Sequence, residues 1–218
     1  MAQAQKVVLE GGVGEIVEKK SRFIASVFPV HGEEEVLGII ESMRKKYWDA
    51  RHNCYAYILG ENREVQRYSD DGEPGGTAGR PMLDILLAED VTDCLVVVTR
   101  YFGGTLLGTG GLVRAYQQST KEGLLSAKIA QKKKGIVLNL EMDYTTAGKV
   151  QYLIGNEEEN VCVVDTAYTD KVVMQILVCE DFRDAFDKKL TEVTNGRVTI
   201  NQGDIKVYAL ADKKLIFL

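Results

Sequence analysis

The sequence predicts an α+β protein made of two domains, and three observations support this class. Apolar residues recur at every second position in some segments and at helical spacing in others, so strands and helices alternate along the chain. A polar break at 131–135 separates two patterned halves. The length of 218 residues suits two domains of about 100 residues each. We place the domains at residues 1–131 and 132–218.

The first half is expected to alternate between strands and helices. A period-two pattern ends at Pro29, and the next segment begins with acidic residues and ends with basic ones, as the helix dipole favours. Pro81 suits the first position of a helix, where its missing N–H has no cost. The expected elements are strand 14–30, helix 33–46, hairpin strands 53–59 and 64–69, helix 81–88, strand 94–99 and helix 112–127.

The second half follows the order strand, helix, strand, strand, helix, strand. This order is typical of the ferredoxin-like split βαβ arrangement. The expected elements are strand 136–142, helix 145–155, strands 161–167 and 172–179, helix 181–193 and strand 197–202, with 205–218 as an extra strand or tail.

Composition excludes several classes of protein. No apolar run approaches the roughly 20 residues that span a bilayer, and residues 1–6 lack a signal-peptide core, so we expect a cytoplasmic protein without membrane contact. The net charge of −5 gives no support to charge-driven, sequence-blind nucleic-acid binding. The four cysteines form no Cys-x-x-Cys pair, so we expect buried, inert thiols rather than a zinc site or a disulfide framework.

Two glycine-rich runs, 72–79 and 103–111, each lead into an apolar helical segment. The first is followed by Arg80 and the second by Arg114, so both helices are expected to start with an arginine. A cation at a helix N-terminus is unfavourable unless an anion lies nearby, so the pattern predicts an anion-binding cleft. Neither run matches a known phosphate loop, because the Lys-Ser/Thr pair is absent and Val113 stands where a dinucleotide fingerprint needs glycine.

Three polar clusters, 49–53, 67–73 and 100–104, lie where predicted strands begin or end. Asp70, Asp71 and Glu73 could ligate magnesium or pair with nearby arginines, and we expect no bound metal or cofactor. Ser69 has only His52 as a plausible base, which argues against a catalytic triad and leaves any catalytic residue unknown. The candidate binding residues are Arg51, His52, Asn53, Arg67, Ser69, Asp70, Asp71, Glu73, Gly75, Gly76, Thr77, Arg80, Arg100, Tyr101, Gly103, Gly104, Gly110, Gly111 and Arg114.

These motifs resemble the YigZ/IMPACT family, and the match in motif order and spacing spans nearly the whole first half. The residues that carry it are Ser21-Arg22-Phe23, Arg51-His52-Asn53-Cys54-Tyr55-Ala56-Tyr57, Tyr68 to Gly79 and Arg100 to Tyr116. The resemblance implies a first domain with the α/β fold shared by a ribosomal small-subunit protein, the fourth domain of elongation factor G and the GHMP kinases. It implies a ferredoxin-like second domain similar to the fifth domain of that factor.

The resemblance also implies a connection to the control of translation, which eukaryotic members exert through protein partners. Our leading hypothesis is a translation-associated regulatory protein that binds RNA, a ribosomal component or a regulatory protein through an Arg/Gly-lined patch. The alternative is an enzyme that acts on a small phosphorylated or acidic metabolite, with arginines holding the anion and His52 or a nearby carboxylate moving the proton. In a third hypothesis, the polar clusters only build a hydrogen-bonded scaffold.

Overall fold

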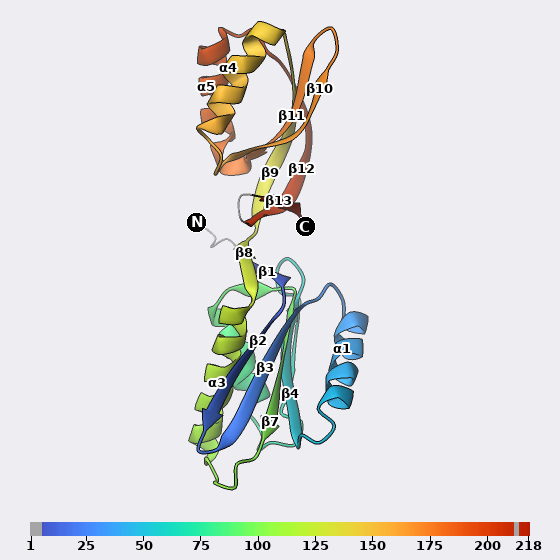
Figure 1. The fold of residues 1–218 in the computed structure, drawn as a ribbon, viewed down its shortest axis with the longest axis vertical. Helices are drawn as coiled ribbons and strands as arrows, with labels where there is room; N and C mark the ends of the chain where they lie inside the picture. Colours follow the sequence, from blue (N-terminus) through green and yellow to red (C-terminus); the bar gives the residue numbers. More distant parts are fainter. Residues whose placement is uncertain (1–5, 212–213) are drawn as a thin grey trace. The chain divides into compact units, whose positions relative to one another are not determined.

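The structure is a computed structural model that describes residues 6–211 and 214–218. The fold is mixed α+β, as expected, and the chain divides into two compact units, 1–131 and 132–218 (Figure 1). No helix in the described ranges has the length and apolar character required to cross a bilayer.

The first unit is built on an antiparallel five-stranded sheet with the strand order β2-β3-β7-β4-β5. Three helices accompany this sheet, and a small second sheet joins β6, β1 and β8. The elements are β1 Lys6–Glu10, β2 Gly12–Glu18, β3 Ser21–Pro29, α1 Glu33–Lys46, β4 His52–Leu59, β5 Val65–Ser69, α2 Gly79–Ala88, β6 Val91–Thr92, β7 Cys94–Tyr101, α3 Thr109–Ser126 and β8 Lys128–Gln131.

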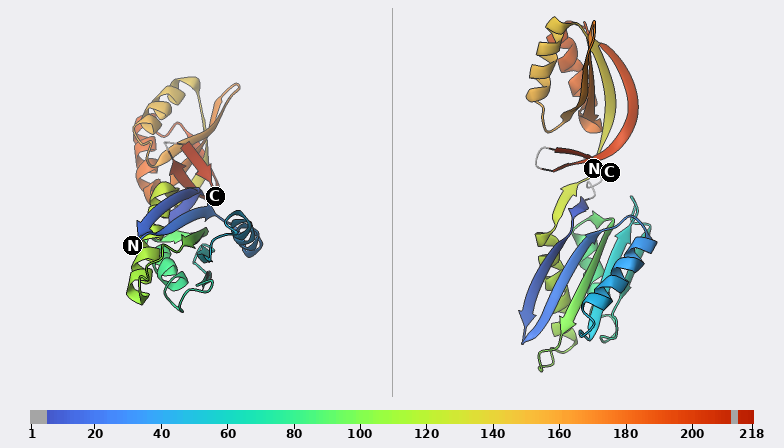
Figure 2. Two further views of the ribbon diagram at one scale, coloured as in Figure 1. Left: turned by 60° about the horizontal axis from the view of Figure 1, so that its bottom comes forward. Right: turned by 45° about the vertical axis from the view of Figure 1, so that its right-hand side comes forward.

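The five-stranded sheet is covered on both faces, which explains why its central strands are almost wholly apolar. On β4, Cys54 and Ala56 belong to the core shared with α2 and α3, whereas Tyr57 and Leu59 belong to the core shared with α1. Figures 1 and 2 show α1 on one face and α3 on the other. The first unit therefore has three layers, helix, sheet and helix.

Helix α3 lies unusually close to the edge strand β2. A Cβ atom placed on Gly14 would lie 2.4 Å from the backbone carbon of Glu122, and one on Gly12 would lie 2.5 Å from Ser126. Only glycine permits such an approach of helix backbone to strand backbone. This contact fixes the position of α3 beside the end of β2.

The second unit has helices on one face of an antiparallel sheet with the strand order β10-β11-β9-β12-β13. Its elements are β9 Lys133–Met142, α4 Tyr144–Gly155, β10 Val161–Tyr168, β11 Val172–Cys179, the 3₁₀ turn η1 Glu180–Phe182, α5 Arg183–Thr194, β12 Thr199–Ala211 and β13 Lys214–Phe217. The core joins alternate residues of β9 and β11, such as Leu138 and Met174, to Val150 of α4 and Leu190 of α5.

The structure corrects several element boundaries. Residues 14–30 form two strands, because the chain reverses at Lys19 and Lys20, whose φ angles are 45° and 66°. Lysine is not a residue that signals a left-handed turn, so the pattern missed this hairpin. Segments 197–202 and 205–218 were also divided wrongly, because β12 runs from Thr199 to Ala211 with a register shift at 202–205.

Both helix starts differ from the expected ones. Helix α2 begins at Gly79, so Pro81 is its third residue rather than its first. Helix α3 begins at Thr109, which places Arg114 in its second turn. The idea that both helices open with an arginine is therefore wrong for α3, because its first turn is made of small residues that apolar periodicity does not detect.

Candidate functional site

The three predicted polar clusters meet at one end of the five-stranded sheet. His52, at the start of β4, is paired in register with Arg100 near the end of β7. Ser69, at the end of β5, is paired with Tyr55 of β4. Strand pairing thus brings together segments that are far apart in the sequence.

The Asp70 carboxylate sits at the N-terminus of α2. Its Oδ1 accepts hydrogen bonds from the backbone N–H groups of Ala78 and Gly79, at 3.0 and 2.9 Å, and its Oδ2 accepts one from Gly76 at 2.8 Å. A helix N-terminus favours a negative charge, and here the chain supplies it. Arg80, the predicted cation of this helix start, pairs one turn later with Asp84, at 2.8 Å.

Asp71 also binds groups of the protein itself. Its Oδ2 accepts the backbone N–H of Asn53 at 2.7 Å and its Oδ1 accepts Arg44 at 2.8 Å, while its carbonyl oxygen lies 2.8 Å from Nδ1 of His52. The Asn53 side chain accepts a hydrogen bond from Thr99 at 2.7 Å. Within the described part of the chain, no three His, Cys, Asp or Glu side chains form a group that could hold a metal.

Arg100 and Glu73 form a buried ion pair. Arg100 Nη1 and Glu73 Oε1 are 2.6 Å apart, with 7% and 3% of the two side chains exposed. The Tyr116 hydroxyl donates to the same oxygen at 2.8 Å, and the Cys54 thiol lies 3.3 Å from that hydroxyl. The guanidinium also lies over the rings of Phe23 and Phe102. This cluster fastens the loop at 70–79 to β7 and α3.

Burial controls the titration of the two neutral members of this cluster. Desolvation raises the pKa of the Cys54 thiol and that of the Tyr116 hydroxyl far above their ordinary values. A thiol held in its protonated form is a poor nucleophile, so Cys54 has a packing role. The contacts around Glu73 therefore favour the hypothesis of a hydrogen-bonded scaffold over that of a catalytic site.

The other predicted residues occupy several different environments. Arg51 and Arg67 are exposed, and the Arg67 guanidinium donates to the backbone carbonyl of its neighbour Gln66. Tyr101 donates to Asp49 at 2.8 Å. The remaining hydroxyls and glycines shape the loops: Ser69 accepts from the Asp71 N–H, Thr77 donates to the Pro74 carbonyl, Gly103 donates to Ser21, and Gly75, Gly104 and Gly110 are exposed.

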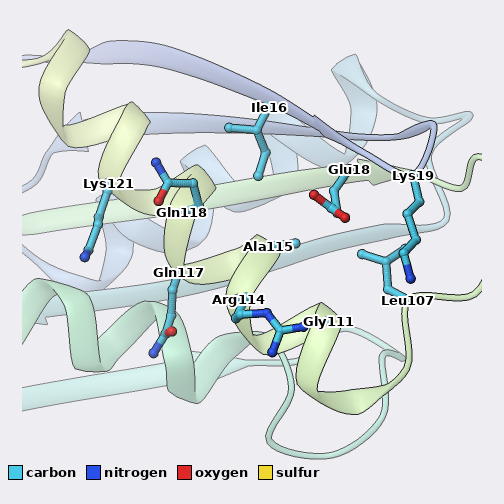
Figure 3. Close-up of a pocket in the computed structure, with 10 residues that line it drawn as sticks. All are labelled: Ile16, Glu18, Lys19, Leu107, Gly111, Arg114, Ala115, Gln117, Gln118 and Lys121. Atoms are coloured by element: carbon cyan, nitrogen blue, oxygen red, sulfur yellow. The ribbon is translucent and has the colours of Figure 1, made fainter.

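A hollow of about 370 Å³ opens between the end of β2 and α3 (Figure 3). We call it the β2–α3 hollow. Of the predicted site residues, Gly111 and Arg114 line it. Its other lining residues are Ile16, Glu18, Lys19, Leu107, Ala115, Gln117, Gln118 and Lys121.

Three cations line the β2–α3 hollow. Lys19 comes from the β2–β3 turn and extends beside Leu107, whereas Arg114 and Lys121 project from α3 (Figure 3). None of the three cations forms an ion pair with another residue of the described ranges, and Glu18 is the one acidic residue among the lining residues. Sequence reasoning missed Lys19 and Lys121. The spacing of Arg114, Gln118 and Lys121, at i, i+4 and i+7, could have revealed this polar helix face.

Fold and site together define a two-domain α+β protein with a carboxylate-capped glycine loop and a basic hollow. Residues 19–124 match the model of the Impact N-terminal domain, and residues 140–197 match a domain of unknown function, DUF1949. The chain belongs to the YigZ/IMPACT family.

Similar proteins cover nearly the whole chain. The IMPACT family member YvyE of Bacillus subtilis is 40% identical over 205 residues, which are 94% of each chain. The IMPACT family member YigZ of Escherichia coli is 34% identical over 184 residues, covering 84% of this chain and 89% of the relative. A solved crystal structure of a hypothetical protein is 30% identical, covers 92% of this chain and 97% of its own, and aligns with a TM-score of 0.57.

Proposed function

We propose that this chain is a translation-associated regulatory protein that binds RNA through phosphate contacts in the β2–α3 hollow. Membership of the YigZ/IMPACT family supports the association with translation. The family resemblance also implies units similar to the fourth and fifth domains of elongation factor G, the second of them ferredoxin-like, and this expected similarity supports RNA as the partner. Family and fold define only the class of protein, so the kind of ligand must be inferred from the residues of the site.

The presence of three cations around one hollow, none of them ion-paired within the described residues, is the observation that carries the proposal. Lys19, Arg114 and Lys121 bring three positive charges against the single negative charge of Glu18 among the lining residues, so the hollow favours an anionic ligand. Gln117 and Gln118 add amide donors at the same wall. Phosphate groups spaced along a nucleic-acid backbone match several cations at once, whereas an isolated carboxylate matches one.

The overall charge of the chain limits the strength of this binding. At a net charge of −5, RNA gains no attraction from the remaining surface, so contacts are confined to the hollow. If three phosphates of a single strand are neutralised, the logarithm of the affinity should fall with the logarithm of salt concentration at a slope of about −2.

Fluorescence anisotropy with a labelled single-stranded RNA, measured between about 50 and 200 mM KCl, tests this proposal. We expect Lys19→Ala, Arg114→Ala and Lys121→Ala each to weaken binding and to reduce the salt slope by roughly 0.7. Lys46→Ala is the matched control, because Lys46 is an exposed cation of α1 that does not line the hollow. Wild-type protein that binds no RNA, or a triple variant that binds as well as wild type, would refute the proposal.

The size of the hollow favours a second candidate, an enzyme or sensor for a small phosphorylated metabolite. Its volume of about 370 Å³ lies within the range of small-molecule sites. However, Asp70, Asp71 and Glu73, the groups proposed to move protons, are hydrogen-bonded to the protein itself. Stabilisation by sugar phosphates of about 2.7 kcal/mol at a hundredfold excess over Kd, without RNA binding, would favour this candidate.

A further inference from the structure

The sheet of the second unit has one face that its helices do not cover. Helices α4 and α5 pack on the face that carries Leu138 and Met174. Residues that alternate with these, such as Asn139 and Gln175, point to the other face and are half-buried. A hollow of about 410 Å³ lies on this second face, and we call it the β9–β11 hollow.

Two amide side chains form the floor of the β9–β11 hollow. Asn139 of β9 and Gln175 of β11 are direct cross-strand partners, and the Gln175 Nε2 donates to the Asn139 Oδ1 at 3.1 Å. Neither side-chain amide has another hydrogen bond within the described residues. The Gln175 side-chain oxygen is left as an acceptor and the Asn139 side-chain nitrogen as a donor.

Part of the lining of this hollow is apolar and includes an aromatic ring, beside the charged Asp204 and Lys206. Val137, Val164 and Phe217 contribute the apolar part, and 48% of Phe217 is exposed. A flat ring can stack on such a phenyl group while its polar edge meets the amides. Lys206 lies at the same hollow, and its Nζ is 3.8 Å from the mostly exposed Asp204, a weak pairing that leaves the ammonium available.

A β-bulge borders the β9–β11 hollow. The register of β12 on β9 jumps from Gln202 opposite Leu138 to Ile205 opposite Ile136, so residues 203 and 204 share one partner position. Bulges leave backbone groups outside the ladder and occur preferentially beside binding sites. The two bulged residues, Gly203 and Asp204, both line the hollow.

We infer that the β9–β11 hollow binds an adenine base that carries a phosphate. The adenine amino group donates to the Gln175 oxygen, a ring nitrogen accepts from the Asn139 amide, and the ring stacks against Phe217. Lys206 contacts the phosphate. This inference shares no residue with the β2–α3 hollow, so it stands or falls independently of the proposed function.

Isothermal titration of the full chain with AMP, GMP, CMP and UMP, and with oligo(A) and oligo(U), tests the inference. Saturable binding of AMP, at least about tenfold tighter than the other nucleotides, supports a free nucleotide as the source of the base. Binding of oligo(A) but not of AMP or oligo(U) supports a base within RNA. Absence of binding by both AMP and oligo(A), or equal binding of all four nucleotides, would overturn it.

Three variants locate the site. Gln175→Leu should weaken binding about tenfold or more, because it removes the acceptor of the base edge. Asn201→Leu is the matched control, since Asn201 is an exposed amide opposite Asn139 that does not line the hollow. Lys206→Ala, a surface change, should abolish the preference for AMP over adenosine. Equal binding by Gln175→Leu and Asn201→Leu, both with wild-type circular dichroism, would refute the assignment.

Discussion

Removal of the Arg100 guanidinium is the sharpest test of the buried cluster. In an Arg100→Met variant, the Glu73 carboxylate, with 3% of its side chain exposed, loses its counter-ion and keeps only the Tyr116 hydroxyl at 2.8 Å. Breaking a buried ion pair by removing one partner costs about 3–5 kcal/mol. The loss should therefore be a large share of the stability of a typical domain, which is about 5–15 kcal/mol.

Hydrogen exchange read on β7 peptides measures this loss without assuming that the two units unfold together. A cost of about 3 kcal/mol corresponds to exchange faster by roughly a hundredfold, since each 1.4 kcal/mol is a factor of ten. Arg22→Met is the control, because Arg22 and Glu15 form an ion pair with two hydrogen bonds, at 2.7 and 2.8 Å, but at the surface. Its loss should be much smaller.

A double-mutant cycle then separates the pair from the individual side chains. Glu73→Gln retains an oxygen that can accept from Tyr116 and removes the charge, so the double variant Arg100→Met/Glu73→Gln buries no unpaired charge. We expect it to be more stable than the sum of the single losses predicts, by about 1–3 kcal/mol. If Arg100→Met costs no more than Arg22→Met, or if the two changes are additive, the argument from burial is wrong.

Three further predictions concern the first unit. Asp70→Ala should cost about 1–2 kcal/mol and speed hydrogen exchange at the start of α2, because three backbone N–H groups lose their acceptor. Gly14→Ala should lower the melting temperature, since its Cβ would lie 2.4 Å from backbone, whereas Gly38→Ala in α1 meets nothing within 4 Å and should be neutral or stabilising. Burial raises the pKa of Cys94, so the folded state keeps a proton that the unfolded state loses above about pH 8.5. The free energy of unfolding should therefore fall by up to about 1.4 kcal/mol per pH unit above that value. Cys94→Ala should flatten this slope, as measured by urea denaturation at several pH values.

Each of these predictions has a clear contrary result. Unchanged exchange in α2 after Asp70→Ala would mean that water caps the helix equally well. Equal melting temperatures for Gly14→Ala and Gly38→Ala would mean that α3 can move away from β2 without cost. A pH dependence between pH 8.5 and 10 that is the same with and without Cys94 would assign the alkaline loss to other groups.

Local chemistry made some elements predictable from sequence. Helix α1 was predicted at 33–46 because acidic residues at one end and basic residues at the other mark both boundaries. The almost continuous apolar run 172–179 predicted β11 with the bounds that the structure shows. The hairpin at Lys19 and Lys20 was not predictable, because both residues adopt positive φ and lysine does not signal left-handed backbone.

The candidate site was harder to predict, because its contacts join distant positions. The pattern singled out Arg80, Arg100 and Arg114 as one group of cations, but the fold gives the first two their own carboxylates. Arg100 and Glu73 are 27 positions apart in the sequence, so no local periodicity indicates that they pair. Lys19 and Arg114 line one hollow because the glycines of β2 let α3 approach.

The buried Arg100–Glu73 pair also limits the mutational routes open to this family. A lineage that replaces one member first passes through a protein with an isolated charge in its interior, which selection against misfolding removes. Exchange of the pair for an apolar one therefore requires two nearly simultaneous changes at separate codons. Homologues with an intact first unit should either retain both residues or have replaced both.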